Sequence, residues 1–479
     1  MPVRVLPSAV LTVTGMFAPL PRELRETRYQ FTEDFVMDSS AAQGTFGIRP
    51  TPWDRVLERS SAPTDGQAQA EATGKMNGKQ NGPEPARRGG MGTAELKDLV
   101  RPGMTVAVGD GFGAPRSASR ELSEAAARAG GVRLILGWVP LPDPGLDFGA
   151  FADVRTYMPG WGLRAGTDAG LVSFPPVRLS AVPALLHGHW RPDLLVATVV
   201  QVSGGFAFGT EVSWQRAAIA AGATVAAVIS HRAPHADAGN PLPARRVVVV
   251  GESHEPPGAM PEVSPGPAHR AIATLAAPLI TESARLQVGP SPVATALLDE
   301  LRLPVRIDSG LLPDAVVDLD ERGLLLGEPV TAYLAGGPRL YGWADGRPLL
   351  HPIEYTHDLG RLSADPLFAV NTAVEIDLDG QVNVEGTATS VLGGIGGHPD
   401  YAAAGARSVG GLSIIAVVSE HNGRPTLVSR LSRPVSTPGH DVDVVVTDRG
   451  VADLRGLSRP ERRQALSRLW DGQIAPGEK

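Results

Sequence analysis

A glycine-rich segment carries the most distinctive local chemistry of this sequence. Residues 393–401 read GGIGGHPDY, with four glycines in five positions. Because glycine has no side chain, the backbone N–H groups of such a segment can approach a ligand closely and hold an anion. A tight turn with positive φ angles and no ligand accounts for the same composition. His398 directly follows the glycines, so we treat it as a candidate functional residue.

A second polar segment spans residues 435–458, VSTPGHDVDVVVTDRGVADLRGLS. We predict a strand over VDVVVT, a turn at DRG and a short helix over VADLRG. The charged residues and His440 could position a ligand there. Helix capping and ion pairing at a strand-to-helix turn are the commoner uses of such residues, and we favour them.

Several kinds of reactive site are excluded or disfavoured by residue type and spacing. The chain has no cysteine, which excludes disulfides, thiolate zinc sites and cysteine nucleophiles. It contains no GxSxG elbow and no GxxxxGK[ST] phosphate loop. GDGFGA at residues 109–114 resembles a dinucleotide fingerprint only loosely. We expect no metal, because six histidines follow neither HExxH nor another metal-binding spacing; they are His187, His189, His231, His235, His254 and His269.

Composition describes a globular chain without nucleic-acid or membrane character. Of 479 residues, 42% are hydrophobic and 20% are charged, with a formal net charge of -7. An acidic chain lacks the basic face that neutralises phosphates, and it lacks a polybasic membrane anchor. No apolar run reaches about 18 residues, so we expect no membrane span. We predict a cytoplasmic location, and a homodimer because two-fold dimers are common among oligomers.

The first 90 residues differ from the rest of the chain. Residues 60–90 contain almost no large apolar side chain, so they cannot bury enough surface to offset the entropy of ordering. Residues 1–58 hold only a few aromatics, and Met91 is a natural alternative start. We therefore predict a largely disordered N-terminal extension over residues 1–90.

Strand and helix patterns alternate from Leu96 onward and predict two open α/β domains. Strands that are apolar almost throughout are typical of parallel sheets covered on both faces. A proline-rich stretch at residues 255–267 separates two such series, so we place the domains at residues 91–255 and 256–479. Ligands of open α/β sheets bind beyond the carboxyl ends of the strands. Glycines mark several of these predicted ends, at 109–113, 289, 310 and 336–337.

Taken together, these segments resemble the acetyl-CoA hydrolase/transferase family, which includes acetate and 4-hydroxybutyrate CoA-transferases. The resemblance runs from about Leu96 to Leu469 and is strongest from Phe368 onward. GGIGGHPDY resembles the family's GGxGGxxDF loop, and STPGHDVDVVVTDRGVADLRGLSRPERRQAL resembles its C-terminal block nearly position for position. The resemblance implies two open α/β domains of the CoA-transferase type with CoA in the cleft between them.

The resemblance also implies a reaction. A glutamate of the family attacks the acyl-CoA and forms an anhydride and then a glutamyl-CoA thioester, and a carboxylate or water completes the reaction. The substrates it implies are acyl-CoA, with acetyl or another short acyl group, and a small carboxylate. It assigns CoA contacts to Gly289, Ser291, Gly393, Gly394, Gly396, Gly397 and Val409.

The catalytic glutamate of the family is missing. Its segment, HSEMxSDGVVDL, corresponds to DSGLLPDAVVDL at residues 308–319, which places the glutamate on Gly310. Other departures accompany it: RGA becomes AAG at residues 403–405, a lysine becomes Val409, and the PPDxHG loop shortens to GGFAFG at residues 204–209. Asp308 lies two residues before Gly310 and is a weak candidate nucleophile, because a shorter side chain displaces the carboxylate.

Two functions follow from these observations. One is transfer or hydrolysis of an acyl-CoA without a glutamyl intermediate, with glycine N–H groups binding the thioester oxyanion and Asp308, His398 or Glu354 positioning water. The other is a non-catalytic paralogue that binds CoA esters or serves as a partner subunit of an active homologue. A reaction on a carrier-bound thioester is a more distant possibility that no residue selects.

Overall fold

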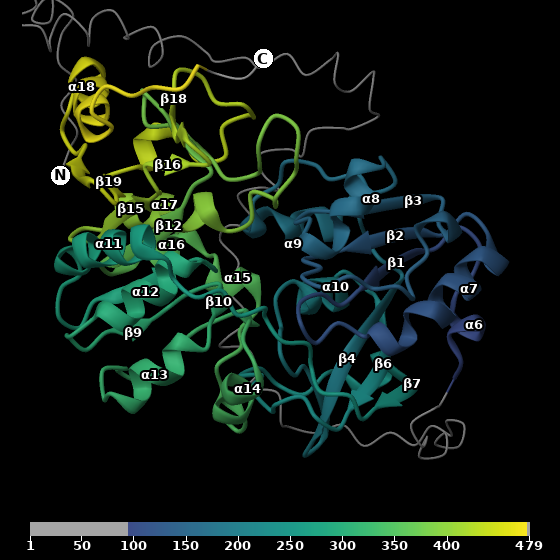
Figure 1. Cartoon of the computed structure of the whole chain (residues 1–479). Coiled ribbons are helices and arrows are strands. Elements are labelled where there is room, and N and C mark those ends of the chain that lie inside the picture. Colours follow the sequence, from purple (N-terminus) through teal and green to yellow (C-terminus); the bar gives the residue numbers. More distant parts are fainter. Residues whose placement is uncertain (1–93, 477–479) are drawn as a thin grey trace, which may run out of the picture. The chain divides into compact units, whose positions relative to one another are not determined.

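Two parallel sheets lie side by side in the described part of the chain (Figure 1). The structure is a computed structural model that describes residues 94–476, which belong to one compact unit. The predicted N-terminal extension, residues 1–90, lies outside the described residues. No described helix is both long enough and apolar enough to cross a bilayer.

The central strands of the first sheet, β1, β4 and β6, are apolar and largely buried on both faces. Its order is β3-β2-β1-β4-β6-β7, every neighbouring pair is parallel, and β5 adds to β4 in the antiparallel sense. Helix α7 ends at Gly130, whose φ of 76° is left-handed, as the glycine in the sequence predicts. The elements are α6 Leu96–Leu99, β1 Thr105–Val108, α7 Ser119–Ala129, β2 Arg133–Leu136, β3 Asp153–Thr156, α8 Arg164–Asp168, α9 Val182–His187, β4 Leu194–Val202, β5 Gly205–Ala207, α10 Gln215–Ala220, β6 Thr224–Ser230 and β7 Val247–Ser253.

The second sheet has the order β20-β19-β15-β12-β8-β9, and all its pairs are parallel except β19–β20. Helix α17 packs on β12 and β15, and α11 packs on β19. The elements are α11 Pro267–Ala276, β8 Arg285–Val288, α12 Pro292–Glu300, β9 Arg306–Ile307, α13 Ala315–Glu321, α14 Pro338–Ala344, α15 Ile353–Thr356, α16 Leu359–Ala364, β12 Leu367–Thr372, α17 His398–Arg407, β15 Leu412–Ala416, β19 Val444–Thr447, β20 Gly450–Asp453 and α18 Arg459–Leu469.

The predicted fold class, two open α/β sheets with largely parallel strands, is confirmed. One element was predicted wrongly: VADLRG does not form a helix. Residues of this segment form β20, which pairs with β19 through a tight turn at Asp448 and Arg449. Val451 and Ala452 lie in this edge strand. Its backbone pairing with β19 outweighs the local preference of the segment for a helix.

Three small sheets surround the second large one. Residues 330–337 and 374–378 have the apolar pattern of ordinary strands, so the sequence alone would place them in the main sheet. In the structure, strands from both ranges belong to small sheets instead. The first pairs β10 Leu311–Leu312 with β11 Tyr333–Leu334; the second joins β13 Glu375–Asp377, β14 Val382–Asn383 and β18 Leu427–Val428; the third pairs β16 Glu420–His421 with β17 Arg424–Pro425.

Backbone hydrogen bonds connect the segment after β5 to the small sheet that contains β11. Val212 N–H donates to the carbonyl of Ala332 at 3.1 Å, and Leu334 N–H donates to the carbonyl of Thr210 at 2.8 Å. A single buried hydrophobic cluster contains side chains from both sheets, including Ala107 of β1 and Val288 of β8. The two sheets therefore share one core, which fixes the position of anything that lies between them.

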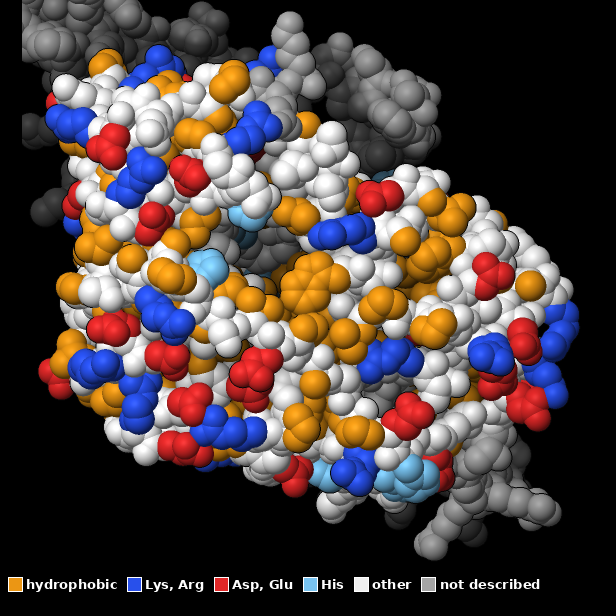
Figure 2. All heavy atoms as spheres, in the orientation of Figure 1, with side chains coloured by type: hydrophobic (Ala, Val, Ile, Leu, Met, Phe, Trp, Pro, Cys, Tyr) orange, Lys and Arg blue, Asp and Glu red, His pale blue; other side chains and the backbone are white. Residues whose placement is uncertain are grey.

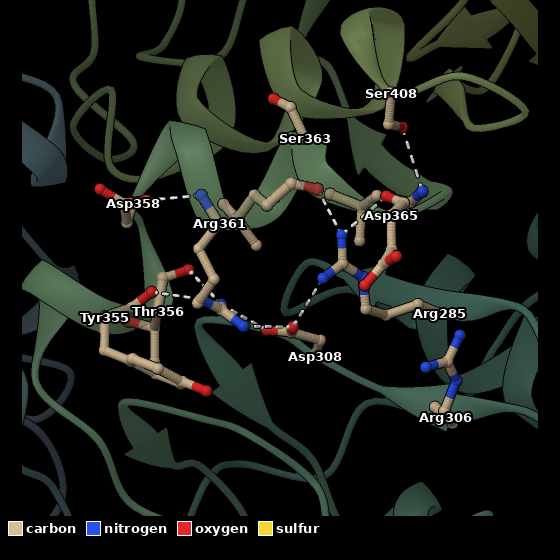
Figure 3. Close-up of polar contacts among 12 residues, drawn as sticks. Arg285, Arg306, Asp308, Tyr355, Thr356, Asp358, Arg361, Ser363, Asp365 and Ser408 are labelled. Atoms are coloured by element: carbon tan, nitrogen blue, oxygen red, sulfur yellow. Dashed lines mark hydrogen bonds and ion pairs between the residues drawn. The ribbon is translucent and has the colours of Figure 1, made fainter.

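A charged cluster anchors the chain immediately before Gly310 (Figure 3). Asp308 follows β9, and both of its carboxylate oxygens accept from the Arg361 guanidinium of α16, at 2.7 and 2.9 Å. Arg285 of β8 lies 3.7 Å from the same carboxylate and donates to the carbonyl of Asp365 at 2.9 Å. Since all three charged side chains are largely buried, the cluster ties β8, β9 and α16 together.

Removal of the Asp308 carboxylate tests this anchor. The variant Asp308→Ala leaves two guanidinium groups without their shared anion, so the free energy of unfolding is expected to fall by about 3–5 kcal/mol. Urea unfolding followed by circular dichroism measures the change. Asp453→Ala, which breaks the exposed pair with Arg455, is the control and should change stability by about 1 kcal/mol or less. Equal stability of the two variants would contradict the anchoring role.

Candidate functional site

A cavity of about 320 Å³ lies between the two sheets. Gln287, Val288 and Gly289 reach it from the end of β8, and Asn371 and Thr372 from the end of β12. These two adjacent strands are the place where the order of the second sheet reverses direction, which is where open α/β sheets bind ligands. Figure 2 shows this face hollowed between the two sheets, with hydrophobic and histidine side chains around the hollow.

The first sheet closes the cavity from the opposite side. Residues after the carboxyl ends of β2 and β3 contribute apolar side chains, and Met260 comes from the segment that connects the two sheets. The carboxyl edges of both sheets thus meet at one cavity. Its lining from this side is Trp138, Met158, Pro159, Gly160, Trp161, Leu179 and Met260.

The glycine-rich loop forms one wall of the cavity. All four of its glycines, Gly393, Gly394, Gly396 and Gly397, are in the lining. A Cβ atom on Gly394 would lie 3.0 Å from the Met158 Cα atom, which only glycine avoids. Gly396 has a left-handed φ of 60°. Gly394 is therefore required for close approach, and Gly396 for its backbone conformation.

Two contacts hold this loop against the first half of the chain. Leu179 N–H donates to the Gly396 carbonyl at 3.0 Å. Asp400, in the first turn of α17, accepts from the Ser180 hydroxyl at 2.6 Å and from Ser180 N–H at 3.1 Å. Burial raises the pKa of Asp400 to about 6, against the effect of these hydrogen bonds. The loop is thus fixed by residues more than two hundred positions earlier in the sequence.

Gly310 also lines the cavity, and an imidazole fills the space beside it. A Cβ atom on Gly310 would lie 3.1 Å from His357 Nε2, and a Cβ atom on Gly397 would lie 2.3 Å from the same nitrogen. His357 therefore stands between Gly310 and the glycine loop. Its side chain occupies room that a side chain at residue 310 would need.

The tautomer of His357 follows from its hydrogen bonds. His357 Nδ1 lies 2.8 Å from Thr356 Oγ1, and the Thr356 hydroxyl donates to the Pro352 carbonyl at 3.4 Å. Both contacts are satisfied together only when Nδ1–H donates to Thr356, which leaves a lone pair on Nε2. Among the described residues Nε2 has no partner, so this lone pair faces the cavity. Burial lowers the pKa of His357 to about 3, so the ring is neutral at physiological pH.

His398 lines the cavity as well, but its ring nitrogens are occupied. Nδ1 lies 2.7 Å from Thr437 Oγ1, and Nε2 lies 3.2 Å from the carbonyl of Thr372. Burial lowers the pKa of His398 to about 4. With both nitrogens engaged, this side chain fixes the start of α17 and has no free lone pair for a substrate.

A buried carboxylate supports the floor of the cavity. Asp110, directly after β1, accepts through one oxygen from Tyr333 OH at 2.6 Å, Tyr157 OH at 3.2 Å and Trp138 N–H at 2.9 Å. Tyr333 also accepts from the Ser213 hydroxyl, and its ring lines the cavity. Burial raises the pKa of Asp110. It also raises the pKa of the neighbouring Glu211 to about 8, so Glu211 is protonated at neutral pH.

The lining of the cavity contains no Asp, Glu, Lys or Arg among the described residues. Its polar character comes from neutral groups. Gln287 Nε2 donates to Asn371 Oδ1 at 3.2 Å, while Gln287 Oε1 and Asn371 Nδ2 are buried without any hydrogen-bond partner. Buried groups of this kind are commonly completed by a ligand or a water. The side chains with polar atoms in the lining are Gln287, Tyr333, His357, Asn371, Thr372, His398, Tyr401 and two indoles.

The structure separates the residues that the sequence analysis proposed for the site. Gly289, Gly310, His398 and the four loop glycines meet in the cavity, whereas the others lie outside its lining. Ser291 caps α12 by accepting from Ala294 N–H at 3.2 Å. Val409 is 93% exposed. Asp308 belongs to the arginine cluster, and Glu354 and His440 are exposed at the surface.

The structure also locates the segments in which the sequence departs from the resembled pattern. Ala403 and Gly405 lie inside α17, and a Cβ on Gly405 would lie 2.9 Å from the Leu412 carbonyl, so this glycine allows the helix to pack closely on β15. Part of the shortened loop forms β5. Neither segment reaches the cavity lining.

Five residues in or beside the cavity were not predicted from the sequence: His357, Tyr333, Asp110, Gln287 and Asn371. Gln287 and Asn371 are polar residues near the ends of apolar strands, and that position was a usable signal. His357 offered no spacing motif, because its neighbours Gly310 and Gly397 are separated from it by some forty residues on either side. Only the packed structure brings the three together.

Comparison with known proteins gives the relationships of the chain. Residues 336–473 match the family model of the acetyl-CoA hydrolase/transferase C-terminal domain. The chain is 29% identical over 324 residues to a succinyl-CoA:cyclohexane-1-carboxylate CoA transferase of Geobacter metallireducens, covering 62% of this chain and 73% of that protein. It is 26% identical over 325 residues to a 4-hydroxybutyrate coenzyme A transferase of Clostridium kluyveri, covering 63% and 75%.

Among solved structures, RipA from Yersinia pestis superposes with a TM-score of 0.71 at 22% identity, covering 79% of this chain and 94% of that chain. At this identity the likeness speaks for the fold alone. The fold, the matched C-terminal domain and the relatives agree with the resemblance seen in the sequence. Residues 336–473 are therefore similar to the C-terminal domain of acetyl-CoA hydrolases/transferases, and the relatives of the chain include CoA-transferases.

Proposed function

We propose that this chain binds the thioester end of an acyl-CoA in the cavity and hydrolyses it by direct attack of water, without a glutamyl-CoA intermediate. One observation carries the proposal. His357, neutral and with a free lone pair on Nε2, stands between Gly310 and the glycine loop in a cavity whose described lining residues include no charged side chain. The relatives that act on CoA thioesters are CoA-transferases and an acetyl-CoA hydrolase.

The neutral lining supports binding of the uncharged part of an acyl-CoA. A cavity of about 320 Å³ is too small for the whole molecule, so the nucleotide and its phosphates lie outside. The pantetheine amides and the thioester carry no charge and need only hydrogen bonds and apolar contact. Gln287 Oε1 and Asn371 Nδ2 offer an unused acceptor and an unused donor for these groups.

The same lining argues against transfer to a carboxylate. An acceptor carboxylate would have to leave water for a cavity with no Lys or Arg among its described lining residues, which is costly for an unpaired anion. Among the described lining residues there is also no carboxylate to carry the acyl group or CoA between two half-reactions. Water avoids the desolvation cost, because it enters the cavity as a neutral molecule, and its direct attack needs no carrier carboxylate.

The hydrolysis would proceed as follows. The oxygen of a water attacks the thioester carbonyl carbon while His357 Nε2 accepts its proton, and backbone N–H groups of residues 394–397 stabilise the oxyanion. The C–S bond then breaks, and the proton passes from the imidazolium to the leaving thiolate. The products are a carboxylic acid and CoA with a free thiol.

A second function, binding of acyl-CoA without turnover, is favoured by one specific observation. A pKa of about 3 makes His357 a weak base, although it keeps the ring unprotonated. If this weak base contributes nothing, the cavity remains a binding site for CoA esters. The homodimer and the cytoplasmic location inferred from the sequence stay predictions.

Hydrolysis depends on the imidazole in this proposal. His357→Ala is expected to lower the rate of free-CoA release from acetyl-, propionyl- or succinyl-CoA by about 10²-fold, the usual contribution of a general base. A thiol-reactive dye measures released CoA, and calorimetry measures binding. The control is His440→Ala, a change at an exposed histidine outside the cavity lining, which should leave the rate unchanged. Tight binding with no CoA release by the unchanged protein would instead support the binding-only function.

The low pKa of His357 sets the expected pH dependence. Because this pKa lies at about 3, the base stays deprotonated throughout the range from about pH 5 to 8, and protonation of His357 should not reduce kcat/KM there. An ordinary histidine base would lose activity as the pH falls through about 6.5. Initial rates in buffers of constant ionic strength distinguish the two. A fall in kcat/KM with an apparent pKa near 6.5 would contradict His357 as the base.

Restoration of the missing nucleophile tests the position of Gly310. Gly310→Glu alone should fail to form a glutamyl-CoA adduct, because the new Cβ would lie 3.0 Å from His357 Cε1. Gly310→Glu combined with His357→Ala makes room and is expected to form the adduct with acetyl-CoA, visible by intact-mass spectrometry. Gly310→Gln with His357→Ala is the matched control without a nucleophile. An adduct in neither glutamate variant would count against the assignment of residue 310 to the family's catalytic position.

A further inference from the structure

A group of potential metal ligands lies at the carboxyl end of the first sheet, away from the cavity. It consists of His231, Glu252 and His254, whose ligand atoms all lie within 4.8 Å of one another. His231 Nε2 is 2.9 Å from Glu252 Oε2. The rings of His231 and His254 are stacked with centroids 4.3 Å apart and an angle of 7° between their planes. All three side chains are exposed, so an ion can reach them from solvent.

The register of two neighbouring strands explains this arrangement. Strand β6 pairs in parallel with the edge strand β7, with Ile229 opposite Glu252 and Ser230 opposite Ser253. One further step places His231 beside His254, and the His231 N–H donates to the Ser253 carbonyl at 3.0 Å. Because side chains alternate along a strand, Glu252 and His254 share the face on which His231 also lies.

The site is separate from other hollows of the sheet. The alternating residues Ser230 and Ser253 line a small cavity of about 40 Å³. The three ligands point to the opposite face, and none of them lines either cavity described for this chain. The scaffold consists of paired backbone at the ends of β6 and β7, which fixes the Cα positions of the ligands before any ion arrives.

We propose that His231, Glu252 and His254 bind one divalent transition-metal ion of the zinc class. Two imidazole nitrogens and one carboxylate oxygen match the ligand preference of Zn²⁺, whereas Mg²⁺ and Ca²⁺ prefer oxygen ligands throughout. Bonds of about 2.0–2.2 Å to a shared ion require the three ligand atoms to lie roughly 3.5 Å apart. At least one of the two exposed, stacked imidazole rings must turn out of the parallel arrangement for both nitrogen lone pairs to point at one ion. Water completes the coordination shell on the exposed side.

The proposal revises the expectation of no metal that came from the sequence. Glu252 and His254 form only a short ExH pattern, and His231 lies 21 positions before Glu252. This spacing differs from the common zinc-site motifs, because pairing of β6 with β7 brings the third ligand to the other two. The site is independent of the proposed hydrolysis, so its test does not depend on any activity.

Metal binding by the full chain without an affinity tag tests the proposal. Isothermal titration with ZnCl₂ is expected to show one equivalent bound, and Co²⁺ is expected to give the visible absorption of an ion with nitrogen and oxygen ligands. His231→Ala and His254→Ala should each weaken Zn²⁺ binding at least tenfold. His189→Ala, a change at another exposed histidine, is the matched control and should bind like the unchanged protein.

Two further measurements make the outcome decisive. Zn²⁺ should raise the melting temperature of the unchanged protein and of His189→Ala, but not that of His254→Ala, and MgCl₂ should have no such effect. The melting temperatures of all variants without metal should agree, which shows that each has folded. Absence of Zn²⁺ binding, or equal binding in the His231, His254 and His189 variants, would overturn the proposal.

Discussion

The hydrogen bond from Tyr333 to Asp110 is the contact on which the arrangement of the site depends. Asp110 lies two residues after strand β1 of the first sheet, and Tyr333 belongs to a small sheet beside the second. Their contact is buried, and the bridges between residues 210–212 and 332–334 run alongside it. A buried carboxylate that lost this partner would be left with fewer of the hydrogen bonds that offset its burial. The two sheets are thereby held at one separation, and the cavity is the space that this separation leaves.

Within that space, neutral groups supply the hydrogen-bonding atoms. The room beside Gly310 is taken by the His357 imidazole, which burial keeps uncharged. The remaining charges near the site, such as the Asp308–Arg361 pair, stabilise the backbone and do not face the cavity. A low-dielectric pocket of this kind strengthens each hydrogen bond that a ligand makes in it, but excludes ions that cannot be paired.

The fold and the glycine-rich loop could be predicted from the sequence because both depend on local residue patterns. Apolar runs separated by glycine turns define parallel strands, and four glycines around residue 395 define a wall that approaches a ligand. What could not be predicted depends on pairing between distant segments. His357 gains its position from two glycines on separate elements, β20 forms because β19 offers an edge, and His231 meets His254 only through strand register. Val409 illustrates the converse: a position assigned by resemblance lies fully in solvent.

The clamp between Ser180 and Asp400 has a consequence for how the site comes into being. A ribosome delivers the chain from its N-terminus, and domains that emerge early generally fold early. The surface that receives the glycine loop, residues 178–180, is complete long before residue 400 leaves the ribosome. Ser180 and the apolar residues beside it therefore have no partner from the second sheet until that part of the chain has been made. The cavity needs residues from both sheets, so it cannot form on the first sheet alone.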